Sequence, residues 1–329
     1  MRHTSIVAIL MLLAVFSTLS RAGGYSSEYG TRAIARSPDG ELIAIAQTDG
    51  VITIQNADRT IHSIIQADSK HAMALAWRSD STQLATGGED SEIRIWDVAT
   101  GSLLKSIQAF NDGVFVLAWQ PDGDILLASG FDVFRAWDVE VDQPITEPMS
   151  VTFTDMRWNP SGTEFAFSGS GLGTGKFDGT ELKGTRFEDQ ITPCFCYSVD
   201  YSADGNTILT AGGTDGTVRL WDVETGRTIR LLLEADEVIQ DARFLDTAGQ
   251  EVGAVSDTGT LYLIDLTTGE INTRSYLLNL WSIAPNPAND SLFAIGGIIE
   301  QPPSTALPQG VQTANPLISF VNFITRQDR

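Results

Sequence analysis

The stretch that decides the fold is residues 214–228, TDGTVRLWDVETGRT, which the rest of the chain repeats in less regular copies. Asp215-Gly216 is typical of a tight turn, and residues 218–221 alternate apolar and polar side chains as a half-buried strand does. Residues 224–226 predict a second turn before another apolar stretch at 229–231. This short stretch therefore predicts two strands and two turns.

Another strand pair precedes it. Residues 198–210, SVDYSADGNTILT, predict a strand, a Ser-Ala-Asp-Gly turn and a further strand. The full unit is then four short strands in about forty residues. Such a unit cannot bury both its faces alone, so its copies must stack on one another.

The unit resembles the repeat of the WD-repeat β-propeller family. Three Trp-Asp pairs carry the resemblance, each with a turn aspartate five or six residues earlier: Trp96-Asp97 with Asp90, Trp137-Asp138 with Asp132, and Trp221-Asp222 with Asp215. The resemblance implies antiparallel four-stranded blades around a central channel, and a protein that binds other proteins.

Length and repeat period together predict one large domain. After the N-terminal segment about 300 residues remain, which makes seven units of about forty. We expect an all-β fold over residues 23–329, a seven-bladed β-propeller of four-stranded antiparallel blades.

The sequence leaves open how the seventh blade closes. Residues 25–29 could supply a closing strand, the blade could be incomplete, or residues 318–324 could be its outer strand with part of the loop at 298–316 as the third. That loop contains four prolines and almost no aromatic residues. We expect it to be disordered alone and to order on binding.

Residues 1–22 differ from everything after them. Arg2 and His3 precede an apolar run at 6–16, short for a bilayer span, and residues 20–22 are typical of a signal-peptidase site. We expect a cleaved secretory signal and a secreted or periplasmic protein without membrane contact. An uncleaved anchor is the alternative. No cysteine follows the run, so a lipoprotein anchor is not favoured.

A strong negative charge disfavours one class of partner. The mature chain would carry 21 − 2 = 19 Lys and Arg against 42 Asp and Glu, a net charge of −23. Binding of nucleic acid depends on Lys and Arg that displace phosphate counterions, so we expect no nucleic acid partner. We favour a solvated acidic exterior, with recruitment of cations or a basic partner as the alternative.

The repeat itself explains most of the conspicuous side chains. Six of the seven tryptophans recur at two phases, as buried packing between blades requires: Trp77, Trp119 and Trp158, and Trp96, Trp137 and Trp221. The turn aspartates are Asp49, Asp90, Asp132, Asp215 and Asp257. The histidine that pairs with them in the family is absent, so we expect them to bond backbone or hydroxyl groups.

The residues favour neither an enzyme nor a cofactor or metal site. Besides His3, only His62 and His71 are present, and no Ser or Cys motif accompanies them. The glycine-rich residues 169–176 lack the spacing and hydroxyl of a phosphate loop. Cys194 and Cys196 could form a strained, reducible disulfide or be two small apolar residues; we favour the second.

The resemblance implies a partner-binding face at the loops that enter each blade. Just inside those loops the blades carry Arg32, Met73, Phe115, Thr154, Tyr197, Gln240 and Trp281. We predict that Met73, Phe115, Tyr197 and Trp281 form a patch with Phe110, Phe195 and His71, rimmed by Glu89, Asp112 and Asp241. The alternative is that these side chains only fill the central channel.

These observations predict an exported, monomeric, non-enzymatic platform for protein partners. The alternative is an extracytoplasmic propeller enzyme, or a lectin-like protein that binds carbohydrate or calcium with carboxylates at the channel.

Overall fold

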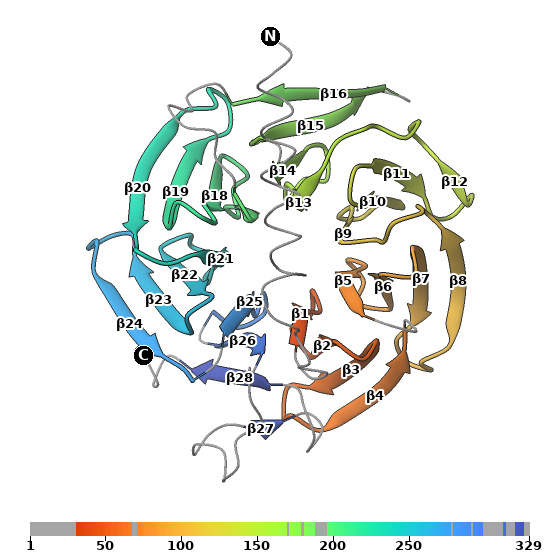
Figure 1. Cartoon of the computed structure of the whole chain (residues 1–329), viewed down its shortest axis with the longest axis horizontal. Helices are drawn as coiled ribbons and strands as arrows, with labels where there is room; N and C mark the ends of the chain where they lie inside the picture. The colour runs from red at the N-terminus through yellow and green to blue at the C-terminus, as the bar shows by residue number, and fades with distance from the viewer. Residues whose placement is uncertain are drawn as a thin grey trace.

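The computed structural model describes residues 31–67, 71–169, 171–178, 181–187, 196–277, 279–290, 292–298, 312–313 and 320–325. The regular elements in these ranges are β-strands, and neighbouring strands pair antiparallel. They form four-stranded sheets around a central axis (Figure 1). The all-β class and the four-stranded antiparallel blade are thereby confirmed. No helix within the described ranges has the length and apolar character needed to cross a bilayer.

Each sheet places one strand at the axis and one at the outside (Figure 1). The inner strands are β1 (Thr31–Arg36), β5 (Ala72–Trp77), β9 (Val116–Trp119), β13 (Phe153–Trp158), β17 (Ser198–Tyr201), β21 (Ile239–Phe244) and β25 (Asn279–Pro285). The second strands are β2 (Leu42–Gln47), β6 (Gln83–Gly88), β10 (Ile125–Ser129), β14 (Phe165–Gly169), β18 (Thr207–Ala211), β22 (Glu251–Ser256) and β26 (Leu292–Ile298).

The third strands are β3 (Val51–Asn56), β7 (Glu92–Asp97), β11 (Phe134–Asp138), β15 (Gly173–Asp178), β19 (Thr217–Asp222), β23 (Thr260–Asp265) and β28 (Phe320–Thr325). The outer strands are β4 (Ile61–Gln66), β8 (Leu103–Gln108), β12 (Gln143–Pro144), β16 (Glu181–Arg186), β20 (Thr228–Glu234), β24 (Ile271–Ser275) and β27 (Gln312–Thr313).

The prediction of a seven-bladed β-propeller needs a correction, because the structure has six regular blades and one sheet of different strand order. Six sheets have their strands in chain order, as the repeat predicts, and are the regular blades, numbered 1 to 6 along the chain. The seventh sheet has the order β25-β26-β28-β27. The chain leaves β26, forms β27 at the outside and only then returns as β28 between them. The cause is the long segment between β26 and β28, which separates two strands that a short turn joins in the regular blades.

This order also decides among the closure alternatives. Residues 320–325 form the third strand, so the alternative that made residues 318–324 the outer strand is wrong. The sheet has four strands and is therefore not incomplete. Residues 25–29 and most of the loop at 298–316 lie outside the described ranges.

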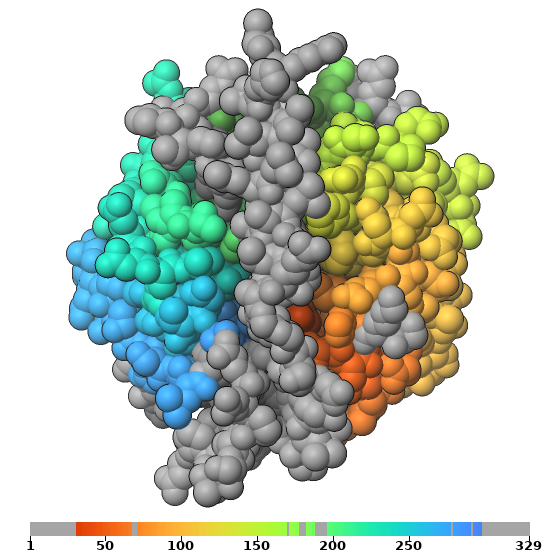
Figure 2. All heavy atoms as spheres, viewed as in Figure 1, coloured from red at the N-terminus to blue at the C-terminus, as the bar shows by residue number. Residues whose placement is uncertain are grey.

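The sheets form a closed ring. Each inner strand contacts the inner strand of the next sheet, and β25 contacts β1. Successive segments accordingly follow one another around the molecule in the space-filling view, from orange through yellow and green to blue (Figure 2).

The hydrophobic core is divided among the junctions between sheets. Each cluster of buried side chains takes its members from two neighbouring sheets: Trp77 and Ile54 share the junction of β5 and β3, and Phe134 and Phe165 stack at 5.9 Å between β11 and β14. The smaller cluster at the closing junction joins Ile34 and Ile43 to Ala284. Burial of these apolar faces is the main force that stacks the blades.

The tryptophans of the Trp-Asp pairs are buried, as predicted. The indole of Trp96 donates to the Thr86 hydroxyl, and that of Trp221 donates to Thr210, both at 2.9 Å. Trp137 is buried too, but its indole makes no hydrogen bond within the described ranges. In that blade an alanine takes the position of the threonine.

The aspartates serve as turn-forming groups. At the end of the third strand, the carboxylates of Asp97, Asp138 and Asp222 accept backbone N–H groups two or three residues on. Before the third strand, Asp49, Asp90 and Asp215 accept the N–H two residues on, and Asp132 accepts the Thr152 hydroxyl. Asp257 differs, because one of its carboxylate oxygens is buried without a hydrogen bond in the described part.

The turn between β1 and β2 tests the closing junction. Gly40 has φ +76°, and an added Cβ would lie 2.3 Å from Asn286 Oδ1 of the last sheet and 2.7 Å from Ala288 Cβ. Gly101 has a similar φ of +67° with open space around it. We expect G40A to lower the free energy of unfolding by about 1–3 kcal/mol more than G101A, because it also overpacks the junction. Chemical denaturation of both variants checks this, and equal losses would contradict it.

Candidate functional site

The inner strands enclose a cavity of about 590 Å³ along the ring axis. At one end of it each blade contributes a half-buried side chain from the same place in the repeat. We call these residues the mouth ring: Arg32, Met73, Phe115, Thr154, Tyr197, Gln240 and Trp281. They are the residues that the repeat places just inside the entry loops.

β-Bulges aim these side chains at the cavity. In β1, β5, β13, β21 and β25 the register shifts across one residue, and that residue belongs to the mouth ring. A bulged residue is left out of the ladder and its side chain is re-aimed. Phe115 and Tyr197 instead lie just before β9 and β17, and their backbone N–H groups donate to Ser129 and Ala211 at 2.9 and 2.8 Å.

The pairing also shows which face carries the mouth. Thr31, at the start of β1, pairs with Gln47 at the end of β2. The turns between second and third strands therefore lie on the same face as the mouth ring, together with the exposed side chains of Asp49, Asp132 and Asp215.

Two members of the mouth ring are in contact across the closing junction. The Arg32 guanidinium lies over the Trp281 ring, 5.6 Å from its centroid. The Trp281 indole nitrogen is buried and makes no hydrogen bond in the described part of the chain. Burial, aided by the Asp257 carboxylate, raises the pKa of Tyr197 above its ordinary value, so this phenol keeps its proton at neutral pH.

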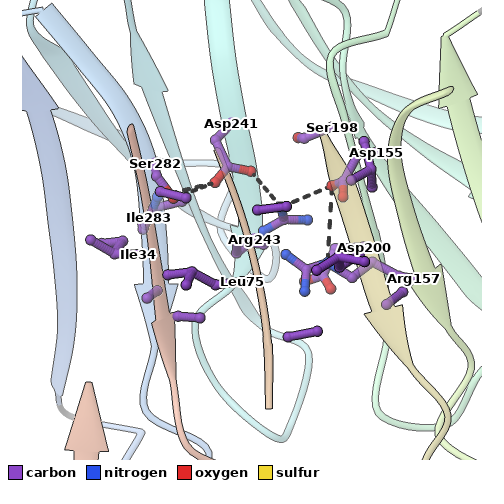
Figure 3. Close-up of a pocket in the computed structure, with 18 of the residues that line it drawn as sticks. Ile34, Leu75, Asp155, Arg157, Ser198, Asp200, Asp241, Arg243, Ser282 and Ile283 are labelled. Atoms are coloured by element: carbon purple, nitrogen blue, oxygen red, sulfur yellow. Dashed lines mark hydrogen bonds and ion pairs between the residues drawn. The ribbon is translucent and has the colours of Figure 1, made fainter. Parts of the chain in front are cut away.

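Deeper in the cavity, charged side chains of blades 4 to 6 form a buried cluster (Figure 3). Arg243 Nη2 lies 2.9 Å from Asp155 Oδ2 and 3.0 Å from Asp241 Oδ1. Its Nη1 donates to the Val199 carbonyl at 2.6 Å. Burial by itself would lower the pKa of Arg243, but the surrounding carboxylates outweigh it and raise that pKa. Arg243 is therefore a permanent cation.

The same cluster links neighbouring blades. The residue after the mouth ring accepts a backbone N–H of the next blade: Asp155 from Val199 at 3.1 Å, Ser198 from Ala242 at 3.0 Å and Asp241 from Ile283 at 3.0 Å. Asp200 likewise accepts the N–H of Phe244 at 3.0 Å. Two other junctions use tryptophan, since the Trp77 and Trp158 indoles donate to the carbonyls of Ala35 and Ala118.

The structure places the predicted binding residues unequally. Met73, Phe115, Tyr197 and Trp281 come together in the mouth ring. Phe110 is buried in the core between blades 2 and 3, so its predicted place in an exposed patch is wrong. His71 is exposed beside the mouth and lies 2.9 Å from Glu89. Phe195 lies outside the described ranges.

Some residues of the site were missed or misplaced by sequence reasoning. Asp241 was expected at an exposed rim but is only 4% exposed, because Arg243 and a backbone N–H hold it inside. Asp155, Asp200 and Arg243 were not singled out at all. The position of Asp155 in the repeat could have identified it, since Thr154-Asp155 and Gln240-Asp241 occupy the same two positions of their repeats.

The described residues contain no group of three or more His, Cys, Asp and Glu that could hold a metal ion. The carboxylates facing the cavity are instead engaged by Arg243 and by backbone N–H groups. Cys196 is buried and disulfide-bonded, so the favoured interpretation of two unbonded small apolar residues is wrong. Cys194 lies outside the described ranges.

Substitution of Arg243 tests whether the ion pairs of the buried cluster stabilise blades 4 to 6. R243M leaves buried carboxylates without their cation, and we expect it to cost about 3–5 kcal/mol of unfolding free energy. R157M is the matched control, because the Arg157 side chain is 44% exposed and its nearest cluster carboxylate lies 3.9 Å away. It should cost at most about 1 kcal/mol. Chemical denaturation compares the two, and similar losses would show that the ion pairs do not hold this region.

Comparison with known proteins finds similarity to WD-repeat proteins. Two family models match parts of the chain: the anaphase-promoting complex subunit 4 WD40 domain over residues 34–122, and the WD domain, G-beta repeat, over residues 187–222.

Three curated proteins illustrate the similarity. Protein LST8 homolog of Drosophila melanogaster is 29% identical over 196 residues, which cover 56% of this chain and 60% of that protein. Target of rapamycin complex subunit LST8 of Bos taurus is 26% identical over 200 residues, 58% of this chain and 59% of that protein. Small ribosomal subunit protein RACK1 of Brassica napus is 26% identical over 163 residues, 50% of this chain and 42% of that protein. The chain thus spans about three fifths of the length of its LST8 relatives.

The matching models, the curated relatives and the ring of four-stranded sheets together support the placement of this chain in the WD40-repeat family.

Proposed function

We propose that the protein is a non-enzymatic interaction platform whose mouth ring docks a segment of a partner protein. The observation that carries this is the convergence of side chains from every blade on one cavity mouth. Three of them are aromatic and one is arginine, the residue types that dominate binding energy in protein interfaces. They stand on or directly before the inner strands of the ring, so they are held in place before a partner arrives.

The open volume of the cavity favours docking of a partner over the alternative that the mouth-ring side chains only fill the central channel. A cavity of about 590 Å³ stays open although the mouth ring and the inner strands line it. Side chains that only filled the channel would close such a space, because protein interiors pack to crystal-like density. The cavity therefore has room for side chains of another molecule.

The relatives are compatible with this role. The Bos taurus relative is named as a subunit of the target of rapamycin complex, and the Brassica napus relative as a protein of the small ribosomal subunit. Both names describe components of larger assemblies. We propose a scaffold role for this chain by analogy with these relatives, and variants of the mouth ring test it.

Affinity capture from the native source tests the platform. The double variant W281A/Y197A removes two aromatic members of the mouth ring, and we expect it to retain at least about tenfold less of the partner than the wild type does. The control is I64A/L104A, which truncates two apolar side chains that are 60% and 53% exposed on the outer strands β4 and β8. Mass spectrometry quantifies the retained proteins, and circular dichroism verifies that both variants fold. Equal retention by the folded W281A/Y197A variant would refute the site.

The proposal includes export from the cytoplasm and cleavage after Ala22. It rests on the short apolar run at residues 6–16 and the small residues that follow it. We expect N-terminal sequencing of the protein from a secreting host to begin at Gly23. L12R/L13R interrupts the apolar run and should leave the full chain in the cytoplasm. Recovery of wild-type protein with an intact N-terminus in the cytoplasm would contradict export.

A further inference from the structure

We infer that the mouth ring receives one carboxylate of the partner segment, held on the side formed by Tyr197, Gln240, Trp281 and Arg32. This inference rests on the proposed function and adds the chemistry of the docked group. It is carried by the charge of the cavity, by the donors around its mouth and by their order in the ring.

The charge of the cavity is opposite to that of the protein. The whole chain has 42 Asp and Glu against 21 Lys and Arg. The cavity is lined by four arginines and three aspartates, a net charge of 4 − 3 = +1: Arg32, Arg36, Arg157 and Arg243, with Asp155, Asp200 and Asp241. The mouth ring itself contains one arginine and no acid. An anionic group inside the mouth would therefore meet Arg32 as the one charged member of the ring, and less repulsion than on the acidic exterior.

The mouth also presents hydrogen-bond donors that an anion can use. The Trp281 indole nitrogen is a donor only, and it is buried without an acceptor within the described ranges. Burial of a donor without a partner costs free energy that an incoming acceptor would recover. Arg32 lies directly over the same ring, and Tyr197 keeps its phenolic proton at neutral pH. Hydrogen bonds from such groups to a carboxylate are stronger than those to a neutral acceptor.

The order of the blades separates these donors from the apolar members of the ring. Tyr197, Gln240, Trp281 and Arg32 come from consecutive blades around the closing junction. Met73 and Phe115 come from the next two blades. A side chain with a carboxylate and apolar methylenes fits both parts, with its charge against the donors and its methylenes against Met73 and Phe115.

The surrounding face limits the partner to a single acid. Asp49, Asp132 and Asp215 are exposed on the turns of this face, and they would repel acidic residues on either side of the docked group. At physiological salt such repulsion acts over about 8 Å, so it opposes acidic residues of the segment that pass close to these carboxylates. One acid among neutral or basic neighbours is therefore favoured over an acidic run.

Arrayed random short peptides, in free-acid and C-terminally amidated forms, test the inference. Wild-type protein selects the peptides, and W281A/Y197A defines binding that does not use the mouth ring. The strongest mouth-dependent peptide is then resynthesised with its Asp or Glu changed to Asn or Gln, and separately with its C-terminal carboxylate amidated. These two changes distinguish a side-chain carboxylate from a chain end. We expect loss of one carboxylate to weaken binding about tenfold or more.

Variants of Arg32 and Trp281 test whether these donors cause the preference for a carboxylate over an amide. R32Q should bind the acid and amide peptides alike, and W281F should reduce the difference by removing only the indole N–H. R227Q is the control, because Arg227 is exposed on a peripheral turn and its loss changes the net charge equally. It should keep the full preference.

The possible outcomes separate the two proposals. Acid and amide peptides that bind the wild type within about twofold, while W281A/Y197A loses both, would overturn the carboxylate and leave the platform standing. Selection of acidic runs over single acids would also overturn the inference. Absence of any peptide that distinguishes the wild type from W281A/Y197A would count against the proposed function itself.

Discussion

The structure depends on how each inner strand is joined to the inner strand of the next blade. Buried backbone N–H groups need acceptors, and inner strands are bonded within their own sheet along one edge only. Blades 4 to 6 supply Asp155, Ser198 and Asp241 as acceptors for such groups of the next sheet. At two other junctions a tryptophan indole reaches across instead. These bonds and the apolar clusters hold independent sheets in one closed ring.

The buried charges follow from the same constraint. Carboxylates that accept backbone N–H groups in the interior leave negative charge away from water, which is unfavourable without a cation. Arg243 supplies that cation and contacts both Asp155 and Asp241. The cluster thus engages the acids that face the cavity, and the lining as a whole carries a small positive charge. A structural requirement between blades consequently sets the electrostatic character of the candidate site.

The bulges connect the scaffold to the site. A regular inner strand would keep every residue in the ladder, whereas the bulge leaves one residue free to turn toward the cavity mouth. Because the bulge recurs at the same phase in five inner strands, and Phe115 and Tyr197 precede the other two, one position of the repeat becomes a ring of side chains. In this chain the position holds seven different residue types, from Thr154 to Trp281. Loops and bulges of this kind carry specificity on a rigid framework.

The sequence by itself determined the local features: the four-strand unit, its turns and the two phases of buried tryptophan. These depend on residues close together in the chain, such as Asp215-Gly216 and the alternation up to Trp221. It also placed Trp281 and its equivalents at one end of the inner strands. The tertiary structure alone decided that Phe110 is core, that β28 lies inside β27, and that Asp155, Asp241 and Arg243 meet. The physical reason is distance along the chain: Asp155 and Arg243 are 88 residues apart, and only the packing of blades 4 to 6 around the axis brings them into contact.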